Sequence, residues 1–377
     1  MKGPVLSLLT LSLLSSCALL QRVGIELSPQ SLGKEREETF FQRVWAKNLD
    51  PPYKTGNLPI GTLAPTIHED ILFQGSLTGD FWAYSLSNGR PLWKVREKEA
   101  ISSPGAVFGK YIIYSDLSGR LHARHYLTGK LIYRFDVGSA VEGKIVFSKG
   151  RGFVHTRNHS LVSFDGATGK ILWSFKRNIP YSATIQGVAT PVVYRDRLIV
   201  GLADGYLASF SLKDGPMIWE KKISKGSKFV DVDMVANVKG KALHVGPHGG
   251  NVLVLDPLSG KIMGRFDVAA SAPPLLTHGK IFLGSDDGQL YVFTEGARLS
   301  KTLPLNPNSP ITHIILWKGN VVATDTKGYL YQIDPKSLKI LSKLHLGHKD
   351  SAVYGNLSWT KKYLAVMGAR NRLYVFQ

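Results

Sequence analysis

The sequence predicts an all-β fold, an eight-bladed β-propeller of four-stranded antiparallel blades that is closed by its N-terminal strand. A turn followed by an alternating apolar strand recurs eight times, at intervals between 38 and 46 residues. A period near 40 with three or four short strands per unit is typical of propeller blades. No segment has the i, i+3, i+4, i+7 apolar pattern of an amphipathic helix, which argues against helical repeats.

The clearest unit runs from Lys280 to Phe293, where two apolar runs are joined by Asp286, Asp287 and Gly288. Two such runs around a short Asp-Gly turn predict a β-hairpin, because glycine tolerates the positive φ that these turns need. The equivalent turn residues of the eight units are Gly79, Gly119, His159, Gly205, Gly250, Gly288, Gly328 and Asn371.

Several units continue with a second glycine turn and an aromatic residue a few positions later. This pattern resembles the pyrroloquinoline-quinone-like repeat, in which such a turn and a Trp dock one blade on the next. The residues expected to dock blades are Trp45, Trp93, Tyr133, Trp173 and Trp219. The fifth unit has Gly264 at this position, and the sixth and seventh units have no aromatic residue, so we expect weaker docking there.

The first strand of the propeller is expected to complete its last blade. The final unit ends at Gln377, just after its third strand. Residues 41–49 form a separate strand-like segment, with Trp45 in the position that Trp93 has in the first unit. Pairing this segment with the last hairpin removes an open sheet edge, which would otherwise favour aggregation. The predicted propeller domain therefore covers residues 41–377.

The N-terminal residues 1–16 have the features of a lipoprotein signal peptide. Lys2 supplies the positive end, and Val5–Leu14 is an apolar segment too short to span a bilayer. The segment ends at Cys17, the only cysteine, in a context that resembles a bacterial lipobox. The resemblance implies cleavage before Cys17 and acylation of its sulfur. The alternative is a buried hydrophobic segment with a chance cysteine.

Residues 17–40 are expected to be a polar, lipidated tether between the membrane and the propeller. Stable membrane anchoring requires two membrane-binding signals, and the acyl chains expected on Cys17 would exceed that number. Ala18 follows the cysteine. In enteric bacteria an aspartate there favours the inner membrane, so the resemblance implies the outer membrane.

The chain is strongly basic, with 47 Lys and Arg against 28 Asp and Glu and a formal net charge of +19. Such a charge favours acidic partners such as anionic lipids, lipopolysaccharide, envelope polymers or nucleic acid. Export argues against nucleic acid. Because the charge is spread along the turns and strands, we favour a solvated basic surface without a dedicated ligand.

We predict no catalytic residues, no metal and no cofactor. His122 and His125 lie three positions apart in one strand, so they point to opposite faces and cannot share a metal. His155, His159, His345 and His348 are interpreted as surface or turn residues. The enzyme alternative is a quinoprotein dehydrogenase, which shares the repeat. Those enzymes commonly carry a vicinal cysteine pair, which this chain lacks.

A lipobox, a polar tether and an eight-bladed propeller together resemble the BamB family of lipoproteins in the β-barrel assembly machinery of Gram-negative bacteria. The resemblance implies a non-enzymatic scaffold at the outer membrane, facing the periplasm. It would bind a POTRA domain of the central, BamA-like barrel protein and support the assembly and insertion of outer-membrane proteins. The alternative function is an envelope lipoprotein that binds acidic glycan or lipid.

The resemblance also implies a partner-binding site on two loops. One family loop carries an Asp-x-Asp pair, matched by Asp231 and Asp233; the other carries leucines and an arginine, where this chain has Ala183, Ile185 and Gln186. Both loops follow the fourth strand of adjacent units, so they should be neighbours on one rim. They also belong to the two longest intervals, and rim loops commonly carry function. The alternative is that the aspartates cap a strand or pair with Lys225 or Lys228.

Overall fold

The structure is a computed structural model that describes residues 40–49, 63–179, 189–224, 230–238, 242–247, 249–347, 351–355 and 357–377. The chain divides into two units, Met1–Phe40 and Phe41–Gln377, and the second contains the propeller. The predicted signal peptide and Cys17 lie outside the described residues. Within these ranges, no helix is long and apolar enough to cross a membrane.

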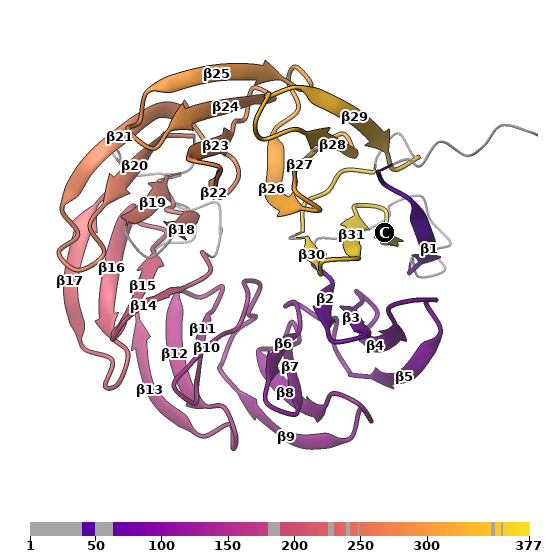
Figure 1. Ribbon diagram of the computed structural model, residues 1–377. Helices are drawn as coiled ribbons and strands as arrows, with labels where there is room; N and C mark the ends of the chain where they lie inside the picture. Colours follow the sequence, from indigo (N-terminus) through magenta and orange to yellow (C-terminus); the bar gives the residue numbers. More distant parts are fainter. Residues whose placement is uncertain are drawn as a thin grey trace, which may run out of the picture. The chain divides into compact units, whose positions relative to one another are not determined.

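The strands form eight sheets, each of four antiparallel strands, arranged as the blades of a ring (Figure 1). Blades 1 to 4 contain β2 (Thr66–His68), β3 (Ile71–Gly75), β4 (Asp80–Ser85), β5 (Pro91–Arg96); β6 (Ala106–Phe108), β7 (Tyr111–Ser115), β8 (Arg120–His125), β9 (Leu131–Asp136); β10 (Val146–Ser148), β11 (Arg151–His155), β12 (Ser160–Asp165), β13 (Ile171–Lys176); and β14 (Val192–Tyr194), β15 (Arg197–Gly201), β16 (Tyr206–Ser211), β17 (Met217–Lys222). Blades 5 to 7 contain β18 (Met234–Val238), β19 (Ala242–Gly246), β20 (Asn251–Leu255), β21 (Ile262–Ala269); β22 (Leu275–Thr277), β23 (Lys280–Gly284), β24 (Gln289–Thr294), β25 (Leu299–Pro304); and β26 (Ile311–Trp317), β27 (Asn320–Asp325), β28 (Tyr329–Ile333), β29 (Ile340–His345). Blade 8 contains β30 (Ser358–Trp359), β31 (Leu364–Gly368), β32 (Arg372–Phe376) and β1 (Arg43–Asn48). The predicted eight-bladed propeller is confirmed.

The N-terminal strand completes the C-terminal blade. β1 pairs antiparallel with β32, placing Trp45 opposite Val375. Beyond the two strands, Gln42 and Gln377 exchange backbone hydrogen bonds of 3.1 and 2.8 Å. β32 therefore gains a partner along its outer edge, and the prediction of closure by the N-terminal strand is confirmed.

The core of the propeller lies between successive sheets. The second and third strands of each blade are the most buried, and in β3 all five residues are buried. The rings of Phe81 in blade 1 and Tyr114 in blade 2 stack 3.7 Å apart. Outer strands such as β5, β9 and β13 alternate between exposed and half-buried residues, because only one of their faces packs against another sheet.

Half-buried aromatic residues on the outer strands pack against glycine turns of the next blade. A Cβ atom on Gly129 would lie 2.9 Å from the Trp93 ring, so only glycine fits beneath the indole. The Trp93 Nε1 donates a hydrogen bond of 2.9 Å to the carbonyl of Tyr126 in the same turn. The same packing joins Trp45 to Gly89, Tyr133 to Gly169, Trp173 to Gly215 and Trp219 to Gly260.

The later blades use other groups at this boundary. Gly264 has no side chain to dock. In blade 6 the Lys301 ammonium group donates a hydrogen bond of 3.0 Å to the carbonyl of Leu338 in blade 7. Between blades 7 and 8, the Trp317 indole donates one of 3.1 Å to the carbonyl of Thr360. The boundaries from blade 6 to blade 7 and from blade 7 to blade 8 thus each contain a hydrogen bond from a side chain of one blade to a backbone carbonyl of the next.

The alternating direction of the strands gives the ring two distinct faces. The turns between strands 1 and 2 and between strands 3 and 4 of every blade lie on one face, which we call the hairpin face. The turns between strands 2 and 3 and the links between blades lie on the other, which we call the link face.

The turns between strands 2 and 3 need positive φ, as predicted. Gly79 and Gly119 have φ of 82° and 91°, and His159 has φ of 63° without being glycine. In the fifth unit the positive φ lies at Gly249 (62°), so the predicted Gly250 is displaced by one residue.

Candidate interaction surface

Two links on the link face contain the predicted partner-binding residues. The first joins β13 to β14 and the second joins β17 to β18. Ala183, Ile185 and Gln186 lie in the first link, outside the described residues. The positions of Asp231 and Asp233, near the end of the second link, are described.

The two aspartates of the second link have opposite environments. Asp231 is completely buried, whereas Asp233 is exposed. Between them, the Val232 backbone N–H donates a hydrogen bond of 3.1 Å to the carbonyl of Leu202 in blade 4. The expectation that both carboxylates face a partner is therefore corrected: the link is tied down at Val232, which turns Asp231 inward and leaves Asp233 at the surface.

Asp231 belongs to an internal electrostatic group. Its carboxylate and that of Asp204 in blade 4 both act to raise the pKa of His159, the buried turn residue of blade 3. Burial lowers the pKa of the His159 imidazole, and this effect outweighs the two carboxylates, which act to raise it. Asp231 thus lies close to titratable groups of blades 3 and 4, in the link that carries Asp233.

The start of the first link is fixed to the same part of blade 4. The Arg177 guanidinium contacts Asp204 at 2.6 Å and Glu220 at 2.7 Å. It also lies 4.9 Å from the centre of the Tyr206 ring. The described ends of both links therefore converge on the turn that joins β15 to β16.

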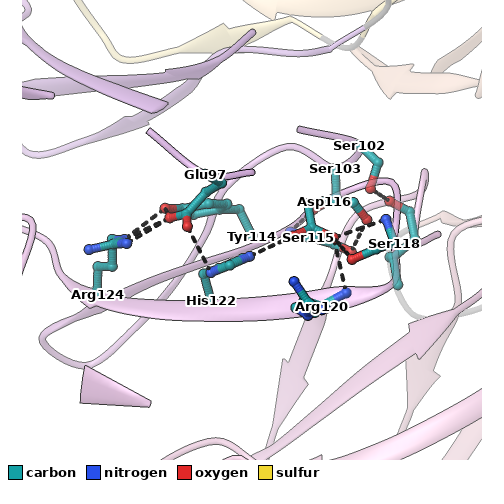
Figure 2. A network of polar contacts seen from close by, with 11 residues as sticks. Glu97, Ser102, Ser103, Tyr114, Ser115, Asp116, Ser118, Arg120, His122 and Arg124 are labelled. Atoms are coloured by element: carbon teal, nitrogen blue, oxygen red, sulfur yellow. Dashed lines mark hydrogen bonds and ion pairs between the residues drawn. The ribbon is translucent and has the colours of Figure 1, made fainter. Parts of the chain in front are cut away.

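A second polar group joins blades 1 and 2 (Figure 2). The buried His122 imidazole lies between two carboxylates, with Nε2 2.9 Å from Asp116 and Nδ1 3.3 Å from Glu97. Glu97 also accepts hydrogen bonds of 2.7 Å from the Tyr114 hydroxyl and 2.7 Å from Arg124 Nη2. Glu97 comes from blade 1 and the other four residues from blade 2, so the group holds two blades together.

Burial and hydrogen bonds within this group shift the pKa values of two of its members. Burial acts to raise the pKa of Asp116, but hydrogen bonds from Ser118 and His122 outweigh it and the pKa is lowered. Burial raises the pKa of the Tyr114 hydroxyl well above its usual range, so the phenol stays protonated. Both nitrogens of His122 face carboxylates, which leaves neither one to activate a nucleophile.

The interpretation of His155 as a surface or turn residue is wrong, because this strand histidine is buried, as is His122. His122 and His155 are each 3% exposed, on strands β8 and β11. Burial lowers the pKa of His155 to about 4. Within the described ranges, no group of three or more His, Cys, Asp or Glu side chains is arranged to hold a metal ion.

The sequence contained a signal for these ionic groups that the repeat analysis missed. The residue 18 positions after the turn residue donates its backbone N–H to that turn in blades 1 to 4. This residue is Val137 in blade 2 and Ile223 in blade 4, but Glu97 in blade 1 and Arg177 in blade 3. A charge at a position that is otherwise apolar predicts an internal partner.

Comparison with known proteins identifies the family. A family model described as "Outer membrane protein assembly factor BamB" matches residues 79–296, which is more than half of the chain. The chain belongs to the BamB family. The matched range runs from the turn before β4 of blade 1 to the turn after β24 of blade 6, and so includes both links described above.

BamB proteins of several bacteria are similar over most of their length. The protein of Moranella endobia is 24% identical over 349 residues, covering 88% of this chain and 89% of that protein. The Escherichia coli protein is 22% identical over 344 residues and covers 87% of each. The predicted resemblance to the BamB family is therefore confirmed.

Solved structures confirm the architecture. The crystal structure of BamB from Moraxella catarrhalis superposes with a TM-score of 0.76 at 17% identity, covering 89% of this chain and 99% of that one. The computationally designed Ika8 protein superposes with a TM-score of 0.70 at 16% identity. Because a designed protein matches nearly as well, these likenesses show the fold alone.

Proposed function

We propose that this protein is a non-enzymatic scaffold lipoprotein that supports the assembly of outer-membrane proteins. The observation that carries the proposal is the BamB family match over blades 1 to 6 of a closed propeller. A ring whose blades are joined by buried ionic groups and aromatic docks presents a rigid surface. Such a surface can position another protein without any bond chemistry.

The proposed location is the periplasmic side of the outer membrane. Acylation of Cys17 would attach the chain to the bilayer, and residues 17–40 would link the anchor to the propeller. Anchoring would raise the effective concentration of the scaffold next to other membrane-bound components.

The proposed partner is a periplasmic POTRA domain of a BamA-like barrel protein, bound at the link face. Asp233 is the exposed carboxylate of the second link, and Ile185 is the apolar anchor expected from the first. Asp231 is completely buried within the same link, so we assign it a role in positioning Asp233 and not in contacting the partner. The described ends of both links converge on one turn of blade 4, which supports a joint contribution to one surface.

Several features support a scaffold rather than an enzyme. The His122 imidazole has a carboxylate on each side, an arrangement like that of a catalytic base with its orienting groups. Its exposed fraction is only 3%, so a substrate cannot reach it. The relatives are named for assembly and not for a reaction. The quinoprotein alternative is tested by adding the quinone with calcium and assaying dye reduction.

The test is co-purification from solubilised envelopes with the barrel protein. The variant Ile185→Asp with Asp233→Arg is expected to lose the partner, whereas Asp214→Arg, which repeats the Asp-to-Arg change on the hairpin face, should retain it. Circular dichroism should show that all variants are folded. Retention of the partner by the double variant would reject this site, and a wild-type chain that captures no barrel protein would reject the proposed function.

A further inference from the structure

The described turns and links of the two faces differ in the sign of their net charge. The described turns of the hairpin face contain fourteen basic and seven acidic residues, a net charge of +7. The described turns and links of the link face contain six basic and nine acidic residues, a net charge of −3. The described strands carry a further seventeen basic and six acidic residues, so the charge is spread over turns and strands as expected, and only the part in the turns and links differs between the faces.

The basic charge of the hairpin face is accessible. All fourteen basic residues in its described turns are exposed, including Lys361 and Lys362 in blade 8. On the link face, by contrast, Arg157 pairs with Glu142, and Arg177 pairs with Asp204. The described turns of the hairpin face thus present more exposed basic side chains than those of the link face, where two of the six basic residues form ion pairs with carboxylates.

Exposed apolar side chains border the same face. The propeller has sixteen large hydrophobic residues that are exposed among those described, and fourteen of them lie in the hairpin-face turns or in the strand residues beside them. Most occupy the first two positions of an outer strand, such as Ile262 and Met263. Trp359, 46% exposed, ends β30 directly before the turn that carries Lys361 and Lys362.

The chain also enters the propeller at this face. β1 is the fourth strand of blade 8, and Arg43 at its start pairs with Phe376 at the end of β32. Fourth strands begin at the hairpin face, so the residues that precede β1 join the ring there. The charge contrast between the described turns of the two faces does not depend on this point of entry.

We propose that the hairpin face docks on an anionic lipid bilayer. Exposed lysine and arginine side chains attract phosphate headgroups, and each contributes about 1 kcal/mol near an anionic surface. Tryptophan and aliphatic side chains beside them favour the boundary between headgroups and acyl chains. An acidic polymer would use the charge but not the apolar border, so the combination favours lipid. Docking in this orientation leaves the link face free for a protein partner.

The test measures binding to vesicles of phosphatidylglycerol and phosphatidylcholine in equal amounts. All chains carry Cys17→Ser, so that an acyl group cannot supply the binding. Reversing two hairpin-face charges with Lys361→Glu and Lys362→Glu should weaken binding about tenfold or more. The matched control is Lys98→Glu with Lys327→Glu, two exposed link-face residues with the same total charge change, and it should bind like the parent.

A second variant separates lipid from acidic polymer. Trp359→Ser should weaken binding to the anionic vesicles and leave binding to soluble dextran sulfate unchanged. Pure phosphatidylcholine vesicles should bind weakly. The proposal is overturned if the parent does not bind anionic vesicles, if both charge-reversal pairs weaken binding equally, or if Trp359→Ser has no effect on vesicle binding. Since no barrel protein is present, these outcomes are independent of the co-purification test.

Discussion

Trp45 of the N-terminal strand packs against Gly89 of blade 1 and donates a hydrogen bond of 2.8 Å from its indole to the carbonyl of Leu86. The strand therefore does two things at once. It pairs with β32 to complete blade 8, and its tryptophan docks that blade on blade 1. The last boundary of the ring is thus closed by a single short segment.

Gly89→Ala is expected to lower the free energy of unfolding by more than the cost of placing alanine at a positive φ. Gly89 has φ of 70°, and a Cβ atom there would lie 2.7 Å from the Trp45 ring. Gly109 has φ of 54° with open space around it, so Gly109→Ala should cost only about 1–2 kcal/mol of backbone strain. Chemical denaturation of both variants measures the difference, and equal losses would show that the dock is unimportant.

Glu97→Ala should lower the free energy of unfolding by roughly 3–5 kcal/mol, because it leaves the partly buried Arg124 and the buried His122 without their shared carboxylate. The double variant Glu97→Leu with Arg124→Leu should recover part of the loss, since no charge is then left uncompensated. Glu99→Ala, an exposed residue two positions away, should stay within about 0.5 kcal/mol of the parent. A small effect of Glu97→Ala in urea denaturation would contradict a structural role.

Acid should destabilise the propeller between pH 6.5 and 4. Burial lowers the pKa of both His155 and His244 from 6.5 to about 4. As the pH falls, the unfolded chain binds these protons first, so the stability present above pH 6.5 declines until the folded state also binds them near pH 4. The loss is roughly 3 kcal/mol per histidine.

His244→Phe provides the matched comparison for this pH dependence. His244 is 4% exposed and stacks on Phe266, so an aromatic ring can take its place. The loss of unfolding free energy between pH 7 and pH 4.5 should be smaller by roughly 2 kcal/mol in this variant than in the parent. Identical pH profiles, measured by denaturant titration, would mean that His244 is not buried as described.

Ala297→Gly should stabilise the protein by about 0.5–1 kcal/mol. Ala297 is exposed in the hairpin-face turn of blade 6 and has φ of 61°. The steric cost of this left-handed conformation for an L-residue is larger than the extra conformational entropy that glycine loses on folding. The reverse change in an equally open turn, Gly319→Ala, should be destabilising by about 1 kcal/mol. Thermal unfolding of the pair tests the prediction, and shifts in the same direction would refute it.

The fold could be predicted because each blade repeats local signals. A turn with positive φ, an alternating strand and a following aromatic recur at nearly constant spacing, so counting them gives the number of blades. The unpaired strand around Trp45 indicated how the ring closes. In the fifth unit the predicted turn residue was wrong by one position, because Gly249 and Gly250 are adjacent and either can adopt the turn conformation.

The candidate site was less predictable because it depends on contacts between units. Nothing in an Asp-x-Asp pattern shows that Val232 is bonded to blade 4 and that Asp231 is turned inward. The positions of Glu97 and Arg177 are visible as exceptions to the repeat, but their partners lie on the next blade. The charge difference between the turns of the two faces depends on which face each turn lies on, and this follows from the order of the strands in the blades.

The pairing of β1 with β32 makes closure of the ring wait until β32 has been made. The residues that meet, such as Ala46 and Tyr374, are far apart in the sequence, so the N-terminal strand stays without its partner until β32 emerges. A product that stops before β32 would keep unprotected sheet edges and offer them to proteases and to other chains. The topology therefore ties closure of the ring to synthesis of all eight blades.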